Sequence, residues 1–167
     1  MQPAFISRIE DHLAPGVQTA PVKVTTDYSY RSEFCAEDNL VLCGDALAFL
    51  DPVFSSGMFF ALYGGVLAAD AIHEGLSKGD TSAPAFLSYS EKFRHGFEAM
   101  RKLVYGFYEE KFSFAQIFKK DPTLRPDLTD CLIGNLFIDF DPLFEAVAQF
   151  AAVPAPLSHG TPLVEAC

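Results

Sequence analysis

The alternation of apolar and polar positions predicts strands near the start of the chain. Residues 22–34 alternate and are rich in Val, Thr and Tyr, which is typical of a strand with one face in water. A turn is predicted at 37–39. Residues 40–43 are wholly apolar and end at Gly44-Asp45, which indicates a short strand buried on both faces of a layered sheet.

Longer apolar patterns predict helices for most of the remaining chain. Largely apolar residues fill 57–75, and apolar residues recur at close to helical spacing over 83–118. The Asp-Pro pair at 121–122 is expected to end the second of these helices. Two shorter helices are predicted at 124–135 and 141–152, followed by a Pro-rich and loosely packed tail.

The uncharged segment 52–69 has nearly the length of a membrane span. It contains two serines and three glycines. It is flanked by Asp51 and Asp70 rather than by the lysines and arginines that mark cytoplasmic loops. We therefore expect a buried helix of a soluble protein and no membrane span.

The composition is that of a folded, acidic protein. The 167 residues are 50% hydrophobic, include 17 Phe and are only 20% charged, which excludes a disordered chain. A net charge of −10 without clustered cations argues against a nucleic-acid partner. Four cysteines without a CxxC pair, and a start without a secretory signal, predict a cytoplasmic protein. The four histidines are not at metal-ligand spacing, so no metal site is predicted.

The residues with the clearest chemistry lie between Leu40 and Phe60. Asp45 follows a predicted strand, where a carboxylate can accept hydrogen bonds from two ribose hydroxyls. The Ser-Ser-Gly sequence at 55–57 begins a helix, whose first N–H groups attract a ring carbonyl or a halide. Pro52 can stiffen the loop between them. These residues also fit a plain turn and an ordinary helix cap, and spacing alone leaves both interpretations open.

Two short runs, Gly44-Asp45-Ala46 and residues 51–57, resemble the second FAD-binding motif of the flavin-dependent halogenases. These enzymes belong to the flavoprotein monooxygenase superfamily with the p-hydroxybenzoate-hydroxylase fold. The resemblance covers about residues 22–145 and includes the tryptophan-halogenase-like pattern Met100-Arg101-Lys102-Leu103-Val104-Tyr105. It implies an α+β, mostly helical fold that forms the C-terminal portion of an FAD/NAD(P)-binding fold. Two or so strands and several helices are expected.

The resemblance also implies roles for individual residues. Asp45, next to Gly44, would bind the FAD ribose, and Pro52 would lie against the isoalloxazine ring. Asp27 would approach the flavin from the neighbouring strand. The resemblance identifies no catalytic residue. Backbone amides would hold the flavin pyrimidine edge at Gly57, Met58 and Phe59 and a halide at Ser56 and Gly57.

Departures from the family pattern limit what the chain can do by itself. Phe54 stands where tryptophan halogenases carry a glutamate, which argues against free tryptophan as the substrate. The glycines form no GxGxxG turn for the FAD pyrophosphate, and a chain without Trp lacks the WxWxIP signature. We therefore expect the isolated chain to be inactive and not to retain FAD.

The organisation implied by the resemblance is a segment 1–80 with the FAD-proximal strands and motif helix, a helical cap at 81–152 and a tail at 153–167. The parent enzyme would use reduced flavin, oxygen and halide to chlorinate a small, electron-rich aromatic substrate. Its partners would be a flavin reductase or a missing N-terminal half, and exposed strand edges would favour homo-oligomers. Alternatives are a flavoprotein monooxygenase or reductase of a hydrophobic substrate, and a non-enzymatic helical interaction module.

Overall fold

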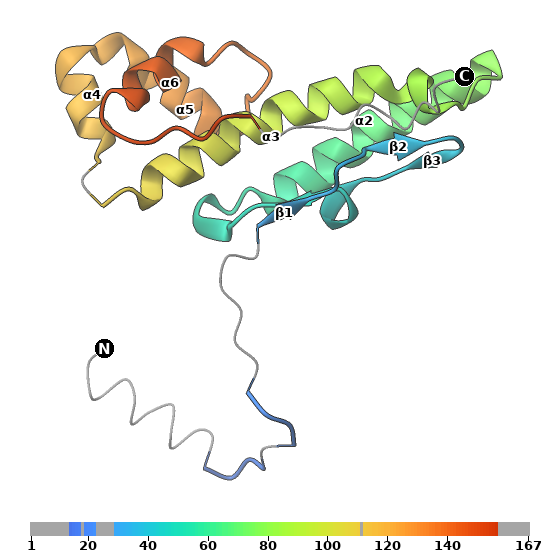
Figure 1. The fold of residues 1–167 in the computed structure, drawn as a ribbon, viewed down its shortest axis with the longest axis horizontal. Coiled ribbons are helices and arrows are strands. Elements are labelled where there is room, and N and C mark those ends of the chain that lie inside the picture. Colours follow the sequence, from blue (N-terminus) through green and yellow to red (C-terminus); the bar gives the residue numbers. More distant parts are fainter. Residues whose placement is uncertain (1–13, 18, 23–28, 111, 157–167) are drawn as a thin grey trace.

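Two long antiparallel helices form the main body of the protein (Figure 1). The computed structural model describes residues 14–17, 19–22, 29–110 and 112–156. Helix α2 (Gly57–Lys78) ends at Gly79, which has a left-handed φ of 70° and donates to the last helical carbonyls. A 3₁₀ turn, η3 (Ala83–Phe86), then begins α3 (Leu87–Tyr108).

Aromatic rings fill the interface between α2 and α3. The Phe60 ring of α2 lies 5.7 Å from the Phe93 ring and 5.6 Å from the Phe97 ring of α3. Gly64 lets the helices approach, because a Cβ at that position would lie 3.0 Å from the Phe93 side chain. All three phenylalanines are buried. The aromatic residues of α3 that remain exposed lie near its end: Tyr105, Phe107 and Tyr108.

The strands are short and antiparallel. Strand β1 (Tyr30–Arg31) pairs with β4 (Ala48–Phe49), and β2 (Ala36–Glu37) pairs with β3 (Leu40–Val41). The predicted turn at 37–39 is present, and Asn39 there has a φ of 62°. Of the strand predicted at 22–34, residues 23–28 lie outside the described part, and β1 is the strand in the remainder.

The prediction of a strand at 40–43 buried on both faces is wrong. Strand β3 has two residues, and Leu40 is 49% exposed. Among the described residues β3 pairs with β2 alone, so no second sheet neighbour covers it. A short apolar run by itself does not distinguish a central strand from a hairpin arm.

The single helix predicted at 83–118 is also wrong, because the chain leaves the helix after Tyr108. Helix α4 (Phe114–Lys120) is separate, and Ser113 caps it by accepting from the amide of Ala115. The Gln116 side chain accepts from the amide of Ser113 in return. This reciprocal cap corresponds to the sequence pattern Ser-x-x-Gln, and it stabilises the start of a new helix.

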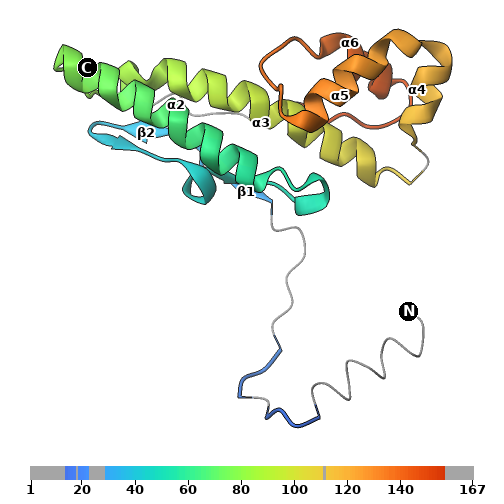
Figure 2. The same cartoon turned by 180° about the vertical axis from the view of Figure 1, so that it is seen from behind.

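Three short helices pack at the far end of α3 from the α2–α3 connection (Figure 2). They are α4, α5 (Arg125–Ile133) and α6 (Asp141–Ala148), with the 3₁₀ turn η4 (Pro122–Leu124) between the first two. The helices predicted at 124–135 and 141–152 are confirmed, although α6 ends earlier. Their core contains Leu103 of α3 together with Cys131, Leu136, Leu143 and Val147.

The described part of the chain is mostly helical with a few short strands, which confirms the predicted fold class. None of its helices combines the length and the apolar character that a bilayer crossing requires. Of the predicted tail, residues 153–156 have no regular secondary structure, and the rest lies outside the described residues.

Candidate flavin and halide site

The Gly44-Asp45 sequence forms a tight 3₁₀ turn, η1 (Gly44–Ala46). Gly44 adopts a φ of 55°, which a residue without a side chain tolerates best. Asp45 is exposed, and its backbone carbonyl accepts a 2.7 Å hydrogen bond from the hydroxyl of Tyr30 in β1. The Asp45 carboxylate is therefore available on the surface while its backbone is held by the neighbouring strand.

The Gly44-Asp45 turn lies beside the start of α2 (Figure 1). A Cβ at Gly44 would be 3.9 Å from the Cβ of Ala61, and nothing else lies within 4 Å. Ala61 is four residues after Gly57, so both are on one helix face and one turn of about 5.4 Å apart. Asp45 and the first turn of α2 are consequently on the same side of the molecule.

The loop before α2 is held by hydrogen bonds on both sides. Turn η2 (Pro52–Phe54) follows Asp51, whose amide donates to the Ser29 hydroxyl at 2.9 Å. The Asp51 carboxylate accepts a 2.7 Å hydrogen bond from the hydroxyl of Tyr108 at the end of α3. Pro52 is exposed, so its ring is available to a ligand.

Helix α2 begins without a side-chain cap. Ser55 has a left-handed φ of 56°, and its amide donates to the Pro52 carbonyl at 2.9 Å. Ser56 occupies the cap position, is 6% exposed and makes no capping hydrogen bond through its side chain. The interpretation of Ser55 as an ordinary cap is therefore wrong. The first amides of α2 lack both intrahelical partners and a serine cap, and this helix end carries partial positive charge.

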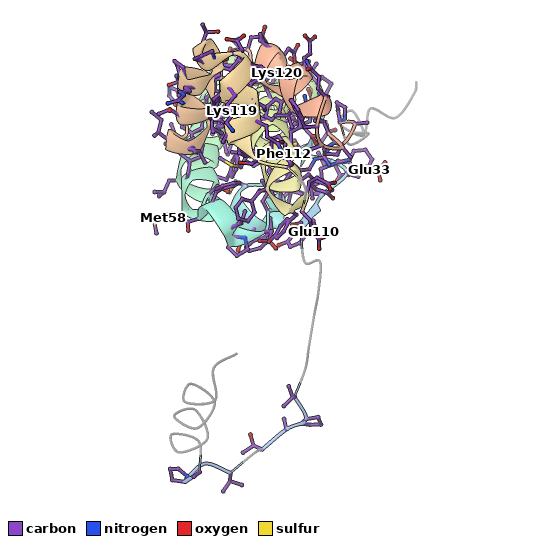
Figure 3. The ribbon with its side chains drawn as sticks, turned by 90° about the vertical axis from the view of Figure 1, so that its left-hand side faces the viewer. Glu33, Met58, Glu110, Phe112, Lys119 and Lys120 are labelled. Atoms are coloured by element: carbon purple, nitrogen blue, oxygen red, sulfur yellow. The ribbon has the colours of Figure 1, made fainter. Side chains whose placement is uncertain are left out.

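The next three residues differ in exposure. Gly57 is exposed, and a Cβ there would meet nothing within 4 Å. Met58 is 75% exposed and lies at the edge of the molecule (Figure 3). Phe59 is half-buried, stacks on Tyr63 at 5.6 Å and packs against Gly134, where a Cβ would lie 2.8 Å from its ring. Phe59 can therefore offer its amide to a ligand while its ring packs inwards.

Aromatic and apolar side chains border the end of α2. Phe54 contacts Phe107 of α3 edge to face, with ring centroids 5.4 Å apart. A small cavity of about 90 Å³ lies between the Ser55-Ser56 segment, Met100 and the end of α5. The site is thus bounded on one side by α3 and α5.

The structure places six of the seven predicted cofactor residues and both halide residues in one region, formed by the Gly44-Asp45 turn, η2 and the first turn of α2. Asp27 lies outside the described residues. No three His, Cys, Asp or Glu side chains gather as metal ligands within the described ranges.

Sequence reasoning missed the residues that fix these loops. Tyr30, Ser29 and Tyr108 make the hydrogen bonds to the Gly44-Asp45 turn and to Asp51. Ser29 and Tyr30 lie within the part of the sequence that resembles the halogenase family, and this resemblance was the signal that could have identified them. Tyr108 lies 57 positions from Asp51, and nothing in the sequence pairs them.

Comparison with known proteins identifies the family. The tryptophan halogenase family matches residues 6–116. A 1H-pyrrole-2-carbonyl-(peptidyl-carrier protein) chlorinase of Pseudomonas fluorescens is 31% identical over 156 residues, which are 90% of this chain and 34% of that protein. The corresponding brominase of Pseudoalteromonas luteoviolacea is 34% identical over 111 residues, 66% of this chain and 27% of that protein.

The structure of the flavin-dependent brominase Bmp2 superposes with a TM-score of 0.63 and 26% identity, over 86% of this chain and 36% of that chain. The chain belongs to the tryptophan halogenase family of flavin-dependent halogenases, as the Gly44-Asp45 and 51–57 motifs predicted. It spans about a third of the length of the chlorinase and about a quarter of that of the brominase.

Proposed function

We propose that this chain forms the flavin and halide side of a flavin-dependent halogenase that acts on an electron-rich aromatic substrate. The observation that carries the proposal is the position of the exposed Asp45 turn beside the uncapped first turn of α2. A carboxylate and a row of amides on one side of the molecule can hold the sugar and the ring of one nucleotide.

The residues present fit FAD. The open space at Gly57 allows a flat ring to approach the backbone, which a side chain would prevent. The exposed Asp45 carboxylate matches the two hydroxyls of a ribose, and the amides of Gly57, Met58 and Phe59 match a pyrimidine edge. Bound FAD, in its reduced form, would react with oxygen, and oxygen would be the two-electron oxidant that turns a halide into a halogenating species.

The role of the chain's own residues is to bind and orient the halide and the flavin. The partial positive charge at the start of α2 attracts a halide to the amides of Ser56 and Gly57. The hydrogen bonds of Asp51 to Ser29 and Tyr108 hold the Pro52 loop beside that position. Burial of Ser56 shields one side of the halide position from water.

Replacing Gly57 with alanine tests the flavin seat. The new methyl group would occupy the open space at the start of α2. The isolated chain is not expected to retain FAD, but weak binding can be followed by amide shifts in an NMR titration with excess FAD. We expect this affinity to fall at least about tenfold, a loss of about 1.4 kcal/mol. The wild-type shifts should be largest at Asp45 and Gly57–Phe59.

Gly65→Ala is the matched control, because a Cβ at Gly65 also meets nothing within 4 Å and Gly65 lies in the same helix. It should bind FAD as the wild type does. Equal affinity of the Gly57 variant, or shifts confined to another surface, would contradict the proposal. Bromide added to the chain in the presence of excess FAD should shift the Ser56 and Gly57 amides. Flavin binding without this shift would favour the monooxygenase or reductase alternative.

Related enzymes suggest the substrate class and partners. Both the chlorinase and the brominase act, by their names, on a pyrrole-2-carbonyl group attached to a carrier protein. Phe54 in place of glutamate fits an uncharged ring better than free tryptophan. We infer a small heteroaromatic substrate, chlorination or bromination as the reaction, and a separate flavin reductase as the source of reduced flavin.

An exposed apolar ridge on α2 is inferred to contact the remaining part of the enzyme. Met58, Leu62 and Val66 repeat every four residues and are 75%, 67% and 58% exposed. The ridge begins inside the proposed flavin site, at Met58. Since this chain spans about a third of the chlorinase, we infer that a segment or subunit equivalent to the rest of that enzyme covers this face and the open strand edges.

Without that cover the isolated chain is expected to self-associate. Light scattering should give a mass above 18.3 kDa at micromolar concentration. The double variant Leu62→Glu/Val66→Glu should be monomeric, because charges on the ridge make its burial costly. Circular dichroism should show unchanged helix content in the variant. A monomeric wild type would count against the ridge as an interface.

A further inference from the structure

A second cavity, separate from the start of α2, lies between β1, β4 and α3. Its volume is about 150 Å³, which is room for about five water molecules. This size suits a single five-membered ring with one substituent. Its lining includes four aromatic side chains and two arginines: Tyr30, Phe49, Phe97, Tyr105, Arg31 and Arg101.

Arg101 is the buried cation of this cavity. Its side chain is 6% exposed, its Nε donates to the Glu98 carboxylate at 2.9 Å, and its Nη2 donates to the Ala155 carbonyl at 2.6 Å. Its guanidinium lies 5.5 Å from the ring centre of Tyr105. These contacts use Nε and Nη2, and no described residue accepts from Nη1. The guanidinium is therefore fixed in orientation and keeps donors for a ligand oxygen.

The guanidinium donors of Arg101 favour an electron-rich group in the cavity. Arg31 and Arg101 both line the cavity, and Glu98 is the carboxylate that pairs with Arg101. A carboxylate or carbonyl oxygen would bind favourably beside the Arg101 guanidinium, because an ionised donor makes stronger hydrogen bonds than a neutral donor does.

The aromatic walls favour a flat ring. Tyr30 and Phe49 stack across the β1–β4 pair, with centroids 6.1 Å apart and planes 14° from parallel. Phe97 and Tyr105 face the cavity from α3. Aromatic side chains pack on a further aromatic ring by stacking or edge-to-face contact.

Two residues that line the cavity are hydrogen-bonded to the two parts of the proposed flavin site. Tyr30, which lines it, donates its hydroxyl to the Asp45 carbonyl. Ser29, which also lines it, accepts from the amide of Asp51 beside Pro52. A ligand in the cavity is therefore next to the segments that would hold the flavin ribose and ring.

We propose that this cavity binds the aromatic acyl group of the substrate, with its carbonyl oxygen on Arg101 and its ring among Tyr30, Phe49 and Tyr105. This inference rests on the proposed function. The recognised chemistry is a heteroaromatic ring bearing a 2-carbonyl group. That group can come from a free carboxylic acid or from a carrier-bound thioester.

Titration of the 167-residue chain tests the proposal without flavin. The probes are pyrrole-2-carboxylate, its N-acetylcysteamine thioester and unsubstituted pyrrole, followed by amide shifts in NMR spectra. We expect shifts at Tyr30, Phe49 and Arg101, and at least about tenfold weaker binding of unsubstituted pyrrole. Binding of the acid alone identifies the free acid as the source. Tighter binding of the thioester than of the acid identifies the carrier-bound form.

Arg101→Lys keeps the charge next to Glu98 but removes the guanidinium fork, and should weaken binding of the carbonyl compounds about tenfold. Tyr105→Ala is the second variant, because Tyr105 is 49% exposed and its loss spares the core. Lys92→Gln is the control, since Lys92 is an exposed cation of the same helix outside this cavity.

Three results would overturn the inference: no binding of either carbonyl compound, unsubstituted pyrrole binding as tightly as the acid, or unchanged binding in both variants. The last result would mean that Arg101 only holds the Ala155 carbonyl in place and does not bind a ligand. The Gly57→Ala variant separates the two proposals, since it should bind the pyrrole compounds normally. Weaker binding of the pyrrole compounds to Arg101→Lys would support the cavity as the substrate site. If Gly57→Ala at the same time left FAD binding unaffected, the proposed flavin site would be rejected.

Discussion

Replacing Phe60 with alanine is expected to lower the free energy of unfolding by about 3–5 kcal/mol. Phe60 is 7% exposed and joins α2 to α3 through ring contacts with Phe93 and Phe97. The cavity left behind would lie in the first turn of α2, directly below the proposed flavin site. A domain of this size has about 5–15 kcal/mol in total, so the variant should lose a third or more of a typical stability of about 10 kcal/mol.

Chemical denaturation followed by circular dichroism measures this loss. Leu76→Ala is the matched control, because Leu76 lies in the same helix and is 67% exposed. Its effect should stay within about 0.5 kcal/mol. A loss below about 1 kcal/mol in the Phe60 variant would show that the α2–α3 interface does not hold the fold together.

Replacing Arg101 with methionine is expected to cost about 3–5 kcal/mol of folding free energy. Methionine keeps much of the side-chain volume but leaves the Glu98 carboxylate, which is 11% exposed, without the cation that contacts it at 2.7 Å. The Ala155 carbonyl would also lose its donor. Most of the cost arises from removing the cation beside a carboxylate that is largely shielded from water.

The double variant Glu98→Gln/Arg101→Met tests that explanation. Removing the charge on both partners should recover about half or more of the loss, because a neutral amide is cheaper to bury. Glu91→Gln on the exposed surface of α3 should change stability by less than about 0.5 kcal/mol. A double variant as unstable as Arg101→Met alone would mean that the Ala155 contact carries the energy.

The candidate site could be predicted from sequence to a large extent because it is built from consecutive residues. The Gly44-Asp45 turn and the start of α2 at Gly57 depend on local conformational preferences, and both lie where the motif predicted. The two C-terminal helices were predictable for the same reason. The break at Tyr108 was missed because apolar spacing continues through 109–118, although Ser113 and Gln116 encode a cap.

The remaining features depend on contacts between distant segments. Strand β1 pairs with β4 across the β2–β3 hairpin, and two residues per strand give too little pattern to predict that pairing. Arg101 stands next to Lys102 in α3, and a charged residue at such a position is ordinarily expected in water. Its burial follows from Glu98 and from the Ala155 carbonyl, 54 positions away.

The contact between Gly134 and Phe59 couples the α5–α6 connection to the start of α2. Position 134 has a φ of 88° and lies against the Phe59 ring, so a bulkier residue would push on the segment that begins α2. Insertions or deletions just after α5 would displace the same ring. Sequence changes in the α5–α6 connection can therefore alter the neighbourhood of the proposed flavin site, while the Gly-Asp and Ser-Gly signatures stay unaltered.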